Sequence, residues 1–183
     1  MKKIYFISTN DYKFKKFNEH FYLENVIVEQ LSEETPEIQA LNNKTVAEFS
    51  AKWAAEKFRV PVIKEDIGMY IKALGGFPGP YLNHIEKWIQ TEGFLNLLNG
   101  KGDRSAFWEF CISYCEPNSD PVSFSTFPKG TIALQPEGDG GWIADKVFIP
   151  EGQDKTISQL IDNKTFQRDN KHYKLLGTYL SNI

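Results

Sequence analysis

The chain has 183 residues, of which 41% are hydrophobic, 14% aromatic and 25% charged. This composition excludes a mainly disordered chain, and the length suits one sizeable core, so we expect a single domain over residues 1–183. The net charge of -3 gives no general attraction to nucleic acid. A phosphate ligand would therefore need a few placed cations and a metal ion.

The N-terminal apolar run ends at the polar residues 8–11, and no later stretch reaches the ~20 residues that cross a bilayer. We therefore expect a cytoplasmic protein with no membrane partner.

The two cysteines, Cys111 and Cys115, lie four residues apart in an expected strand, a separation of ~13 Å that no disulfide can bridge. Free thiols are expected, and the scattered histidines give no zinc-ligand spacing.

Hydrophobic periodicity predicts alternating strands and helices along the chain. We predict strands at 3–8, 26–31, from 61, 69–74, 105–115, 122–134 and 146–149, with a turn at 66–68. We predict helices after Asn10, from a capping box at 45–48, at 81–90, at 92–98 and at 165–180. Because parallel-type and hairpin connections both occur, the pattern indicates an α/β protein with a mixed sheet.

A polar segment separates the first predicted strand from the first helix. It contains the hydroxyls of Ser8 and Thr9, then Asn10, and Lys13 in the first helical turn. A cation there opposes the helix dipole by ~0.3–1 kcal/mol, a cost that an anionic ligand would offset. The segment therefore indicates a phosphate cradle of backbone N–H groups, hydroxyls and an ammonium. The alternative is a solvated lysine on an amphipathic helix.

Acidic residues gather after two of the predicted strands, and Glu37 and Asp66 are the pair that we select as metal ligands. A Mg²⁺ ion that is bound to phosphate needs only one or two protein carboxylates plus water. Asp66 also follows an apolar strand, at the strand end where α/β sheets bind ligands. The alternative is a set of ordinary surface acids.

Two later segments offer groups that suit a nucleotide base. Trp142 and Asp145 combine an aromatic face with a carboxylate, which can stack on a purine and accept its ring N–H. A core tryptophan is the alternative. His172 is a second candidate, or else a surface histidine. The Gly- and Pro-rich loop 75–81 suits close approach to a ligand or another subunit, and equally a plain turn.

Seven segments in order carry a family resemblance: Ser8-Thr9-Asn10 with Lys13, Pro36 to Gln39, Lys64 to Gly68, Ala73 to Tyr81, Glu92-Gly93 with Leu97-Leu98, Asp145 with Phe148 to Gly152, and Thr156 with Leu160. Together they resemble the inosine triphosphate pyrophosphatases over nearly the whole chain. The resemblance implies an elongated mixed β-sheet with flanking helices, two lobes around a nucleotide cleft, and a homodimer. It also implies Mg²⁺-dependent hydrolysis of a nucleoside triphosphate to monophosphate and pyrophosphate.

By position, the resemblance places the triphosphate on Asn10 and Lys13, beside Ser8 and Thr9. It places the metal and its water on Glu37 and Asp66, the base and sugar on Trp142 and Asp145, and the base edge on His172.

The chain departs from the usual family residues mainly at the base end. The departures are Lys16 for an acidic residue, Ile67 for Ser, Ala144 for an aromatic, Gln167 for Lys, and Lys171 and Tyr173 for the Ser and Arg that flank the histidine. Arg168, Lys171 or Lys174 could replace the missing lysine. We therefore predict a retained metal site and weaker discrimination among purine bases.

The first hypothesis is an enzyme that hydrolyses inosine or xanthosine triphosphates or their deoxy forms. In it, Asp66 is the general base and Lys13 neutralises the developing charge. The alternative is a nucleotide-binding or regulatory protein on this fold with reduced or lost turnover. A third possibility is a phosphatase that releases orthophosphate.

Overall fold

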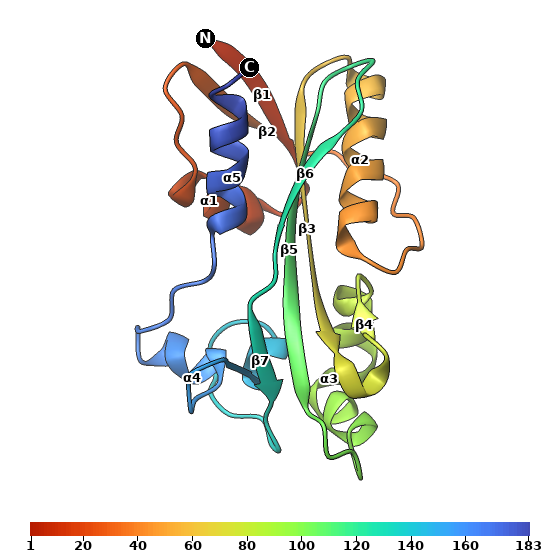
Figure 1. Cartoon of the computed structure of the whole chain (residues 1–183), viewed down its shortest axis with the longest axis vertical. Helices are drawn as coiled ribbons and strands as arrows, with labels where there is room; N and C mark the ends of the chain where they lie inside the picture. Colours follow the sequence, from red (N-terminus) through yellow and green to blue (C-terminus); the bar gives the residue numbers. More distant parts are fainter. The chain divides into compact units, whose positions relative to one another are not determined.

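The computed structural model describes residues 1–183 (Figure 1). Its strands are β1 (Lys2–Ile7), β2 (Val26–Leu31), β3 (Val62–Ile71), β4 (Pro78–Gly79), β5 (Ser105–Cys115), β6 (Val122–Thr126), β7 (Lys129–Ile132) and β8 (Phe148–Pro150). Its helices are α1 (Asp11–His20), α2 (Asn43–Phe58), α3 (Leu82–Leu97), α4 (Ile157–Asp162) and α5 (Lys171–Leu180), with 3-10 turns η1 (Lys72–Leu74) and η2 (Ala144–Lys146).

The eight strands form one mixed sheet with the main order β2-β1-β3-β5-β7-β8. β1 is parallel to β2 and β3, and these strands are connected through α1 and α2. β5 is antiparallel to β6 and β7, β7 is antiparallel to β8, and β4 pairs antiparallel with β3. Helical crossovers therefore join the parallel strands, as geometry requires. The predicted mixed α/β class with flanking helices is confirmed.

The chain forms two compact units, each assembled from separate segments. Unit 1 comprises Met1–Asp66, Phe110–Thr126 and Asn170–Ile183, and unit 2 comprises Ile67–Glu109 and Phe127–Asp169. The single domain over residues 1–183 and the nucleotide cleft stay predictions.

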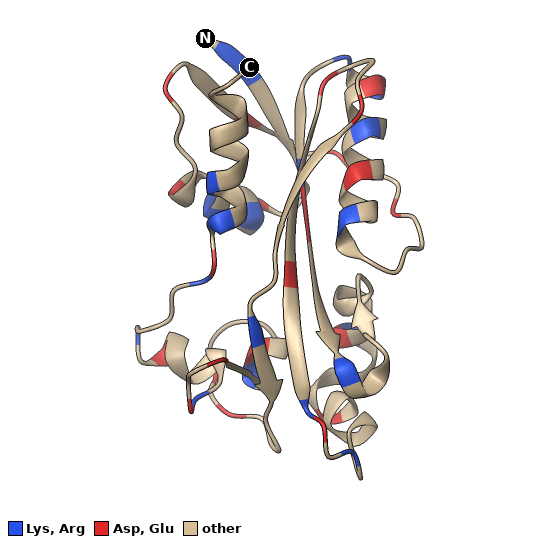
Figure 2. Cartoon of the chain, in the orientation of Figure 1, with Lys and Arg blue, Asp and Glu red and all other residues tan.

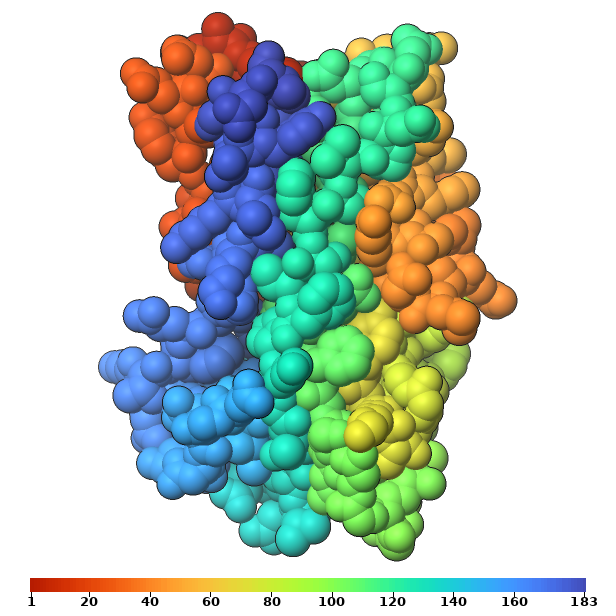
Figure 3. All heavy atoms as spheres, viewed as in Figure 1, coloured from red at the N-terminus to blue at the C-terminus, as the bar shows by residue number.

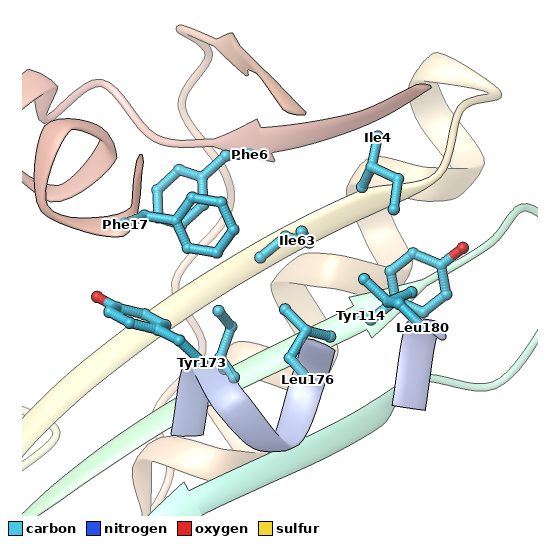
Figure 4. Close-up of a cluster of buried hydrophobic side chains, with 9 residues drawn as sticks. Ile4, Phe6, Phe17, Ile63, Tyr114, Tyr173, Leu176 and Leu180 are labelled. Atoms are coloured by element: carbon cyan, nitrogen blue, oxygen red, sulfur yellow. The ribbon is translucent and has the colours of Figure 1, made fainter. Parts of the chain in front are cut away.

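Unit 1 has an apolar cluster on each side of its strands. On one side, Phe6 and Ile63 pack with Phe17 of α1 and Leu176 of α5 (Figure 4). α5 also lies alongside β6 (Figure 3). On the other side, Val62 packs with alanines of α2. Because side chains alternate along a strand, the residues after Ile63 continue this division: Glu65 lies on the α5 side, and Lys64 and Asp66 lie on the α2 side.

The start of α2 differs from the predicted capping box at residues 45–48. Asn42 is the N-cap, and its Oδ1 accepts from the amide and the hydroxyl of Thr45, both at 2.8 Å. Asparagine caps as well as threonine and comes first in the chain, so the helix begins earlier. The solvent side of α2 carries both signs of charge (Figure 2), with ion pairs such as Lys44–Glu48.

The predicted turn at residues 66–68 is wrong, because β3 runs without a break through Gly68 to Ile71. The chain turns later, where Gly75 and Gly76 have φ values of 66° and 95°. In a strand that pairs with neighbours, a glycine only weakens local preference, whereas positive φ is what a turn requires.

The predicted helix at 165–180 begins only at Lys171. An unpredicted helix, α4, precedes it with a capping box of Thr156 and Gln159. Lys164 has a φ of 59°, and the amides of Thr165 and Phe166 donate to the carbonyl of Leu160, which ends that helix.

Two predicted strands are also shorter than expected. The run at 122–134 divides into β6 and β7 on either side of Pro128, which has no N–H for the sheet. The run at 146–149 is partly the 3-10 turn η2.

The two helices predicted within 81–98 are borne out, because Gln90 has non-helical φ and ψ inside α3. Neither cysteine forms a disulfide, as predicted, and both are buried. None of the helices is long and apolar enough to span a membrane.

Candidate functional site

The polar segment after β1 forms the start of α1, as predicted. The side-chain Oδ1 of Asn10 accepts from the amides of Tyr12 at 3.0 Å and Lys13 at 3.2 Å. The Asn10 amide donates to Ser8 Oγ at 3.1 Å. Asn10 therefore caps the helix and fixes the residues around it, and Thr9 is exposed beside it.

Lys13 lies near two carboxylates of β3. It is half-buried, forms no ion pair, and its charge lowers the pKa of both Glu65 and Asp66. The structure thus brings Lys13 and Asp66 together, as the sequence predicted. An ammonium without a fixed partner is available to bind an anion.

Asp66 is anchored on the α2 side of β3. Its Oδ2 accepts from Asn43 Nδ2 at 2.7 Å, and Asn43, the first residue of α2, is fully buried. Burial raises the pKa of Asp66 from 3.8 to about 6 and the charge of Glu37 adds to this, although Lys13, Asn43 and Lys64 act in the opposite direction. A carboxylate with such a pKa suits proton transfer near neutral pH.

Glu37 completes the acidic pair. It is exposed, and its charge acts on both Asp66 and Lys64. Lys64 donates from Nζ to Thr35 Oγ1 at 2.9 Å, and burial, together with Lys13, lowers its pKa. Lys64 therefore interacts electrostatically with both carboxylates, and Lys13 interacts with Asp66.

The donor set fits Mg²⁺ that is shared with a phosphate ligand. Glu37 and Asp66 supply hard oxygen donors, and their mutual repulsion raises the pKa of Asp66, so a divalent cation would stabilise the charged pair. No group of three or more His, Cys, Asp or Glu side chains is placed to hold a metal. The protein would therefore supply only part of the coordination shell, as is usual for Mg²⁺ bound to a nucleotide.

The α5 side of β3 carries a second buried group, centred on Glu65. Its Oε1 accepts from Tyr173 OH at 2.6 Å and lies 3.1 Å from His172 Nε2. Burial opposes ionisation of Glu65, but the His172 hydrogen bond, Lys13 and Tyr173 outweigh it and keep the pKa of this carboxyl below its usual value. Glu65 is therefore a buried carboxylate that accepts hydrogen bonds.

His172 is not the surface residue that the alternative interpretation described. It is 1% exposed, its ring stacks on Phe110 with centroids 5.7 Å apart, and its Nδ1 is buried without a hydrogen-bond partner. The hydroxyl of Tyr173 binds Glu65 and so belongs to the same buried group.

The remaining predicted residues, Trp142 and Asp145, lie together in unit 2. Asp145 is fully buried, and its Oδ2 accepts from the Trp142 amide and from Arg168 Nη2, both at 2.8 Å. The guanidinium lies 4.5 Å from the Trp142 ring centroid. Asp145 Oδ1 and Arg168 Nη1 are buried and have no hydrogen-bond partner. Each such group costs ~1–3 kcal/mol, so a polar ligand or water would satisfy both.

The sequence did not indicate three residues that belong to the buried polar groups around Asp66, His172 and Asp145. Asn43 gave no signal, because it reads as an ordinary residue at a helix start. Strand alternation places Glu65 on the side opposite Asp66, but the predicted turn at 66–68 hides this signal. In the sequence, Arg168 stands out only as a replacement for a missing lysine.

The family resemblance extends to known proteins. The Ham1 family model matches residues 4–170. A protein of Methanopyrus kandleri named dITP/XTP pyrophosphatase is 37% identical over 158 residues, which cover 86% of this chain and 84% of that protein. A relative of the same name from Thermococcus kodakarensis is 36% identical over 158 residues, covering 86% and 85%.

Solved structures agree with the sequence comparisons. The Ham1 protein of Staphylococcus aureus has a TM-score of 0.84 and 27% identity, and the match covers 99% of both chains. A HAM1 protein of Coxiella burnetii, at 23% identity, has the same fold with a TM-score of 0.84 and full coverage of both chains. The resemblance to inosine triphosphate pyrophosphatases is thereby confirmed. Because the family model spans most of the chain and the relatives exceed a third identity, the chain belongs to the Ham1 family.

Proposed function

We propose that this protein hydrolyses non-canonical purine nucleoside triphosphates, such as dITP and XTP, to the monophosphate and pyrophosphate. The relatives named dITP/XTP pyrophosphatase support this activity. The observation that carries the proposal is the placement of the cation Lys13 near Asp66, a carboxylate whose pKa is raised to about 6. A cation beside a tuned base suits hydrolysis of a phosphate anhydride.

For the triphosphate, we assign binding to Ser8, Thr9, Asn10 and Lys13. The start of α1 provides the positive end of a helix dipole, and Lys13 supplies a full charge. Because Asn10 Oδ1 already accepts from the amides of Tyr12 and Lys13, the groups that remain to donate to phosphate oxygens are Asn10 Nδ2, the hydroxyls and the ammonium.

For the metal, we propose that Glu37 and Asp66 hold Mg²⁺. When bound, the ion would lower the pKa of its water and offset the negative charge of the phosphates. Asn43 keeps one carboxylate oxygen of Asp66 in place through a 2.7 Å hydrogen bond. That contact orients the carboxylate without adding charge.

For the chemical step, we assign Asp66 as the general base. Its Oδ2 is bonded to Asn43, so Oδ1 takes the proton of the attacking water. The water oxygen bonds to the α-phosphorus, the bond from that phosphorus to the bridging oxygen breaks, and pyrophosphate leaves with its electron pair. Lys13 neutralises the charge that develops on the phosphate oxygens.

For the base, we propose that Trp142, Asp145 and His172 recognise the purine and that Arg168 contributes. Arg168 Nη1 can donate to a 6-oxo group, and Asp145 Oδ1 can accept from a ring N–H. In the same register, adenine would place its amine against a donor, a mismatch that buried polar groups penalise strongly. We also propose a homodimer, because the resemblance implies one, and a cytoplasmic location, as expected from the sequence.

The test is a panel of dITP, XTP, ITP, GTP and dATP with Mg²⁺, in which pyrophosphate and orthophosphate are measured separately. We expect pyrophosphate from the 6-oxo purines, none in excess chelator, and at least a 100-fold loss in Asp66→Asn. Nucleotide binding without turnover would instead favour a regulatory protein. Orthophosphate as the first product would indicate a different phosphatase.

A further inference from the structure

Glu65 is a buried carboxylate that the proposed reaction does not use. It is 4% exposed and directly precedes Asp66 in β3, but strand alternation turns it to the α5 side. Buried carboxylates are rare unless they are paired, so its contacts require a reason.

Those contacts all lie in the first turn of α5. One oxygen, Oε1, accepts from Tyr173 OH at 2.6 Å and lies 3.1 Å from His172 Nε2. Two successive residues of one helix thus meet a single atom of the strand that carries Asp66.

Packing alone does not fix which way the His172 ring faces. The ring stacks on Phe110, with planes 21° apart, and lies 4.0 Å from the Tyr173 ring centroid. A half-turn of the imidazole about its bond to the Cβ atom would keep much the same shape between these rings. It would, however, move Nε2 away from Glu65, so the carboxylate selects one ring orientation.

The selected orientation determines the state of Nε2 and the position of Nδ1. Oε1 already accepts from Tyr173 OH, and it accepts from His172 as well when Nε2 carries the ring proton, so the contact favours that tautomer. Nδ1 then faces away from Glu65 and is buried without a partner in the chain. A buried nitrogen of this kind is left for a ligand group or a water.

We propose that Glu65 is a positioning residue for nucleotide recognition: through Oε1 it fixes the ring orientation of His172 and holds the first turn of α5 on β3. This inference rests on the proposed function, because it assigns His172 Nδ1 to the nucleotide. In this proposal Glu65 acts on the nucleotide only through His172, and its hydrogen bond with Tyr173 OH is a second contact between β3 and α5.

Two substitutions of similar size separate the acceptor from packing. Glu65→Gln keeps an oxygen that can accept from both donors, whereas Glu65→Met fills the space without an acceptor. We expect Glu65→Met to raise the KM for dITP at least 10-fold with kcat within 3-fold of the wild type. Glu65→Gln should stay within 3-fold on both constants. Inhibition by inorganic tripolyphosphate, which has no base, should be unchanged in both variants.

A purely structural role gives a different pattern. Glu65→Met would then lower the melting temperature and leave the KM for dITP unchanged, or it would weaken dITP and tripolyphosphate equally; either result overturns the proposal. If Glu65→Met does not fold, Tyr173→Phe decides, because it removes one donor and leaves the His172 contact. We expect its KM within 3-fold of the wild type, and a rise above 10-fold would contradict the assignment to His172.

The ¹⁵N signals of the His172 ring provide a test that does not need turnover. In the wild type and Glu65→Gln, we expect one form with protonated Nε2, and a change at Nδ1 when dITP is added. Identical His172 signals in Glu65→Met would overturn the role of Glu65. If the wild type releases no pyrophosphate from any nucleotide, the proposed function fails, and these spectra then decide the inference alone.

Discussion

Asn43 donates a 2.7 Å hydrogen bond from Nδ2 to Oδ2 of Asp66, which joins the first residue of α2 to β3. The bond lowers the pKa of Asp66, although burial raises that pKa to about 6 overall. The protein thus retains a carboxylate where its charge is costly, which is typical of functional sites.

Asp66→Asn should make the metal-free protein more stable at pH 7 while it abolishes activity. The folded pKa of about 6 lies above the 3.8 of an unperturbed aspartate, so the folded state binds the proton more tightly than the unfolded state. Stability therefore falls as pH rises from about 4 through about 6, by up to ~3 kcal/mol. Urea unfolding should show the gain of the variant above pH 6 and none below pH 4. A less stable variant at pH 7 would contradict this.

Asn43→Ala should raise the pKa of Asp66 further, because the hydrogen bond that favours its charged form is lost. A ¹³C NMR titration of the carboxyl group in metal-free protein measures this shift, and kcat should fall with it. Asn42→Ala is the matched control, since Asn42 only caps the same helix. It should cost ~1 kcal/mol of stability and leave the Asp66 titration unchanged. Equal titration curves for the two variants would exclude the assigned role of Asn43.

Lys13→Ala should fold normally and lose about 10- to 100-fold in kcat/KM, since a charge-assisted hydrogen bond contributes ~1.5–3 kcal/mol. Lys13 forms no ion pair, and it acts on the fold only through the pKa values of Glu65 and Asp66, which should rise in the variant. Lys15→Ala, an exposed neighbour on the same helix, is the control and should behave as the wild type. A large drop in melting temperature with unchanged kinetics would make Lys13 structural.

Arg168→Lys should reduce discrimination between dITP and dATP by about 10-fold, because lysine keeps the charge but loses the planar fork. The guanidinium bonds Asp145 and lies over Trp142, and lysine cannot reproduce both contacts. Arg59→Lys, at an exposed surface ion pair, should leave selectivity unchanged. Unaltered selectivity in Arg168→Lys would remove this residue from base recognition.

Trp88→Glu should shift the proposed homodimer toward monomers. Trp88 is 74% exposed and Tyr81 is 37% exposed, which leaves aromatic surface on and beside α3. Light scattering at micromolar concentration should give a dimer mass for the wild type. A monomer mass for the wild type would refute the dimer, and a dimer that persists in Trp88→Glu would place the interface elsewhere.

Local sequence was sufficient for much of the fold and for the choice of the residues that we propose bind phosphate. Short-range rules predict the polar turn from Ser8 to Asn10, the helix that follows it and the acidic residues at strand ends. The same rules select Lys13, Glu37 and Asp66, and in the structure both Lys13 and Glu37 act on the pKa of Asp66. These rules failed where a glycine or a polar residue is compatible with two local structures. At Gly68 the local sequence suits both a turn and a strand, and strand pairing, a long-range contact, decided between them.

The tertiary structure alone decided the partners of the buried polar groups. Glu65 meets His172 and Tyr173 across more than a hundred residues of sequence, and Asp145 meets Arg168 across a separation of 23. No periodicity encodes such pairs, since a carboxylate has the same local preference whether it is solvated or buried. Desolvation raises the pKa of Asp66 only once the sheet has formed and buried this side chain. The alternation of β3, which places Glu65 and Asp66 on opposite sides, likewise takes effect only in the formed sheet.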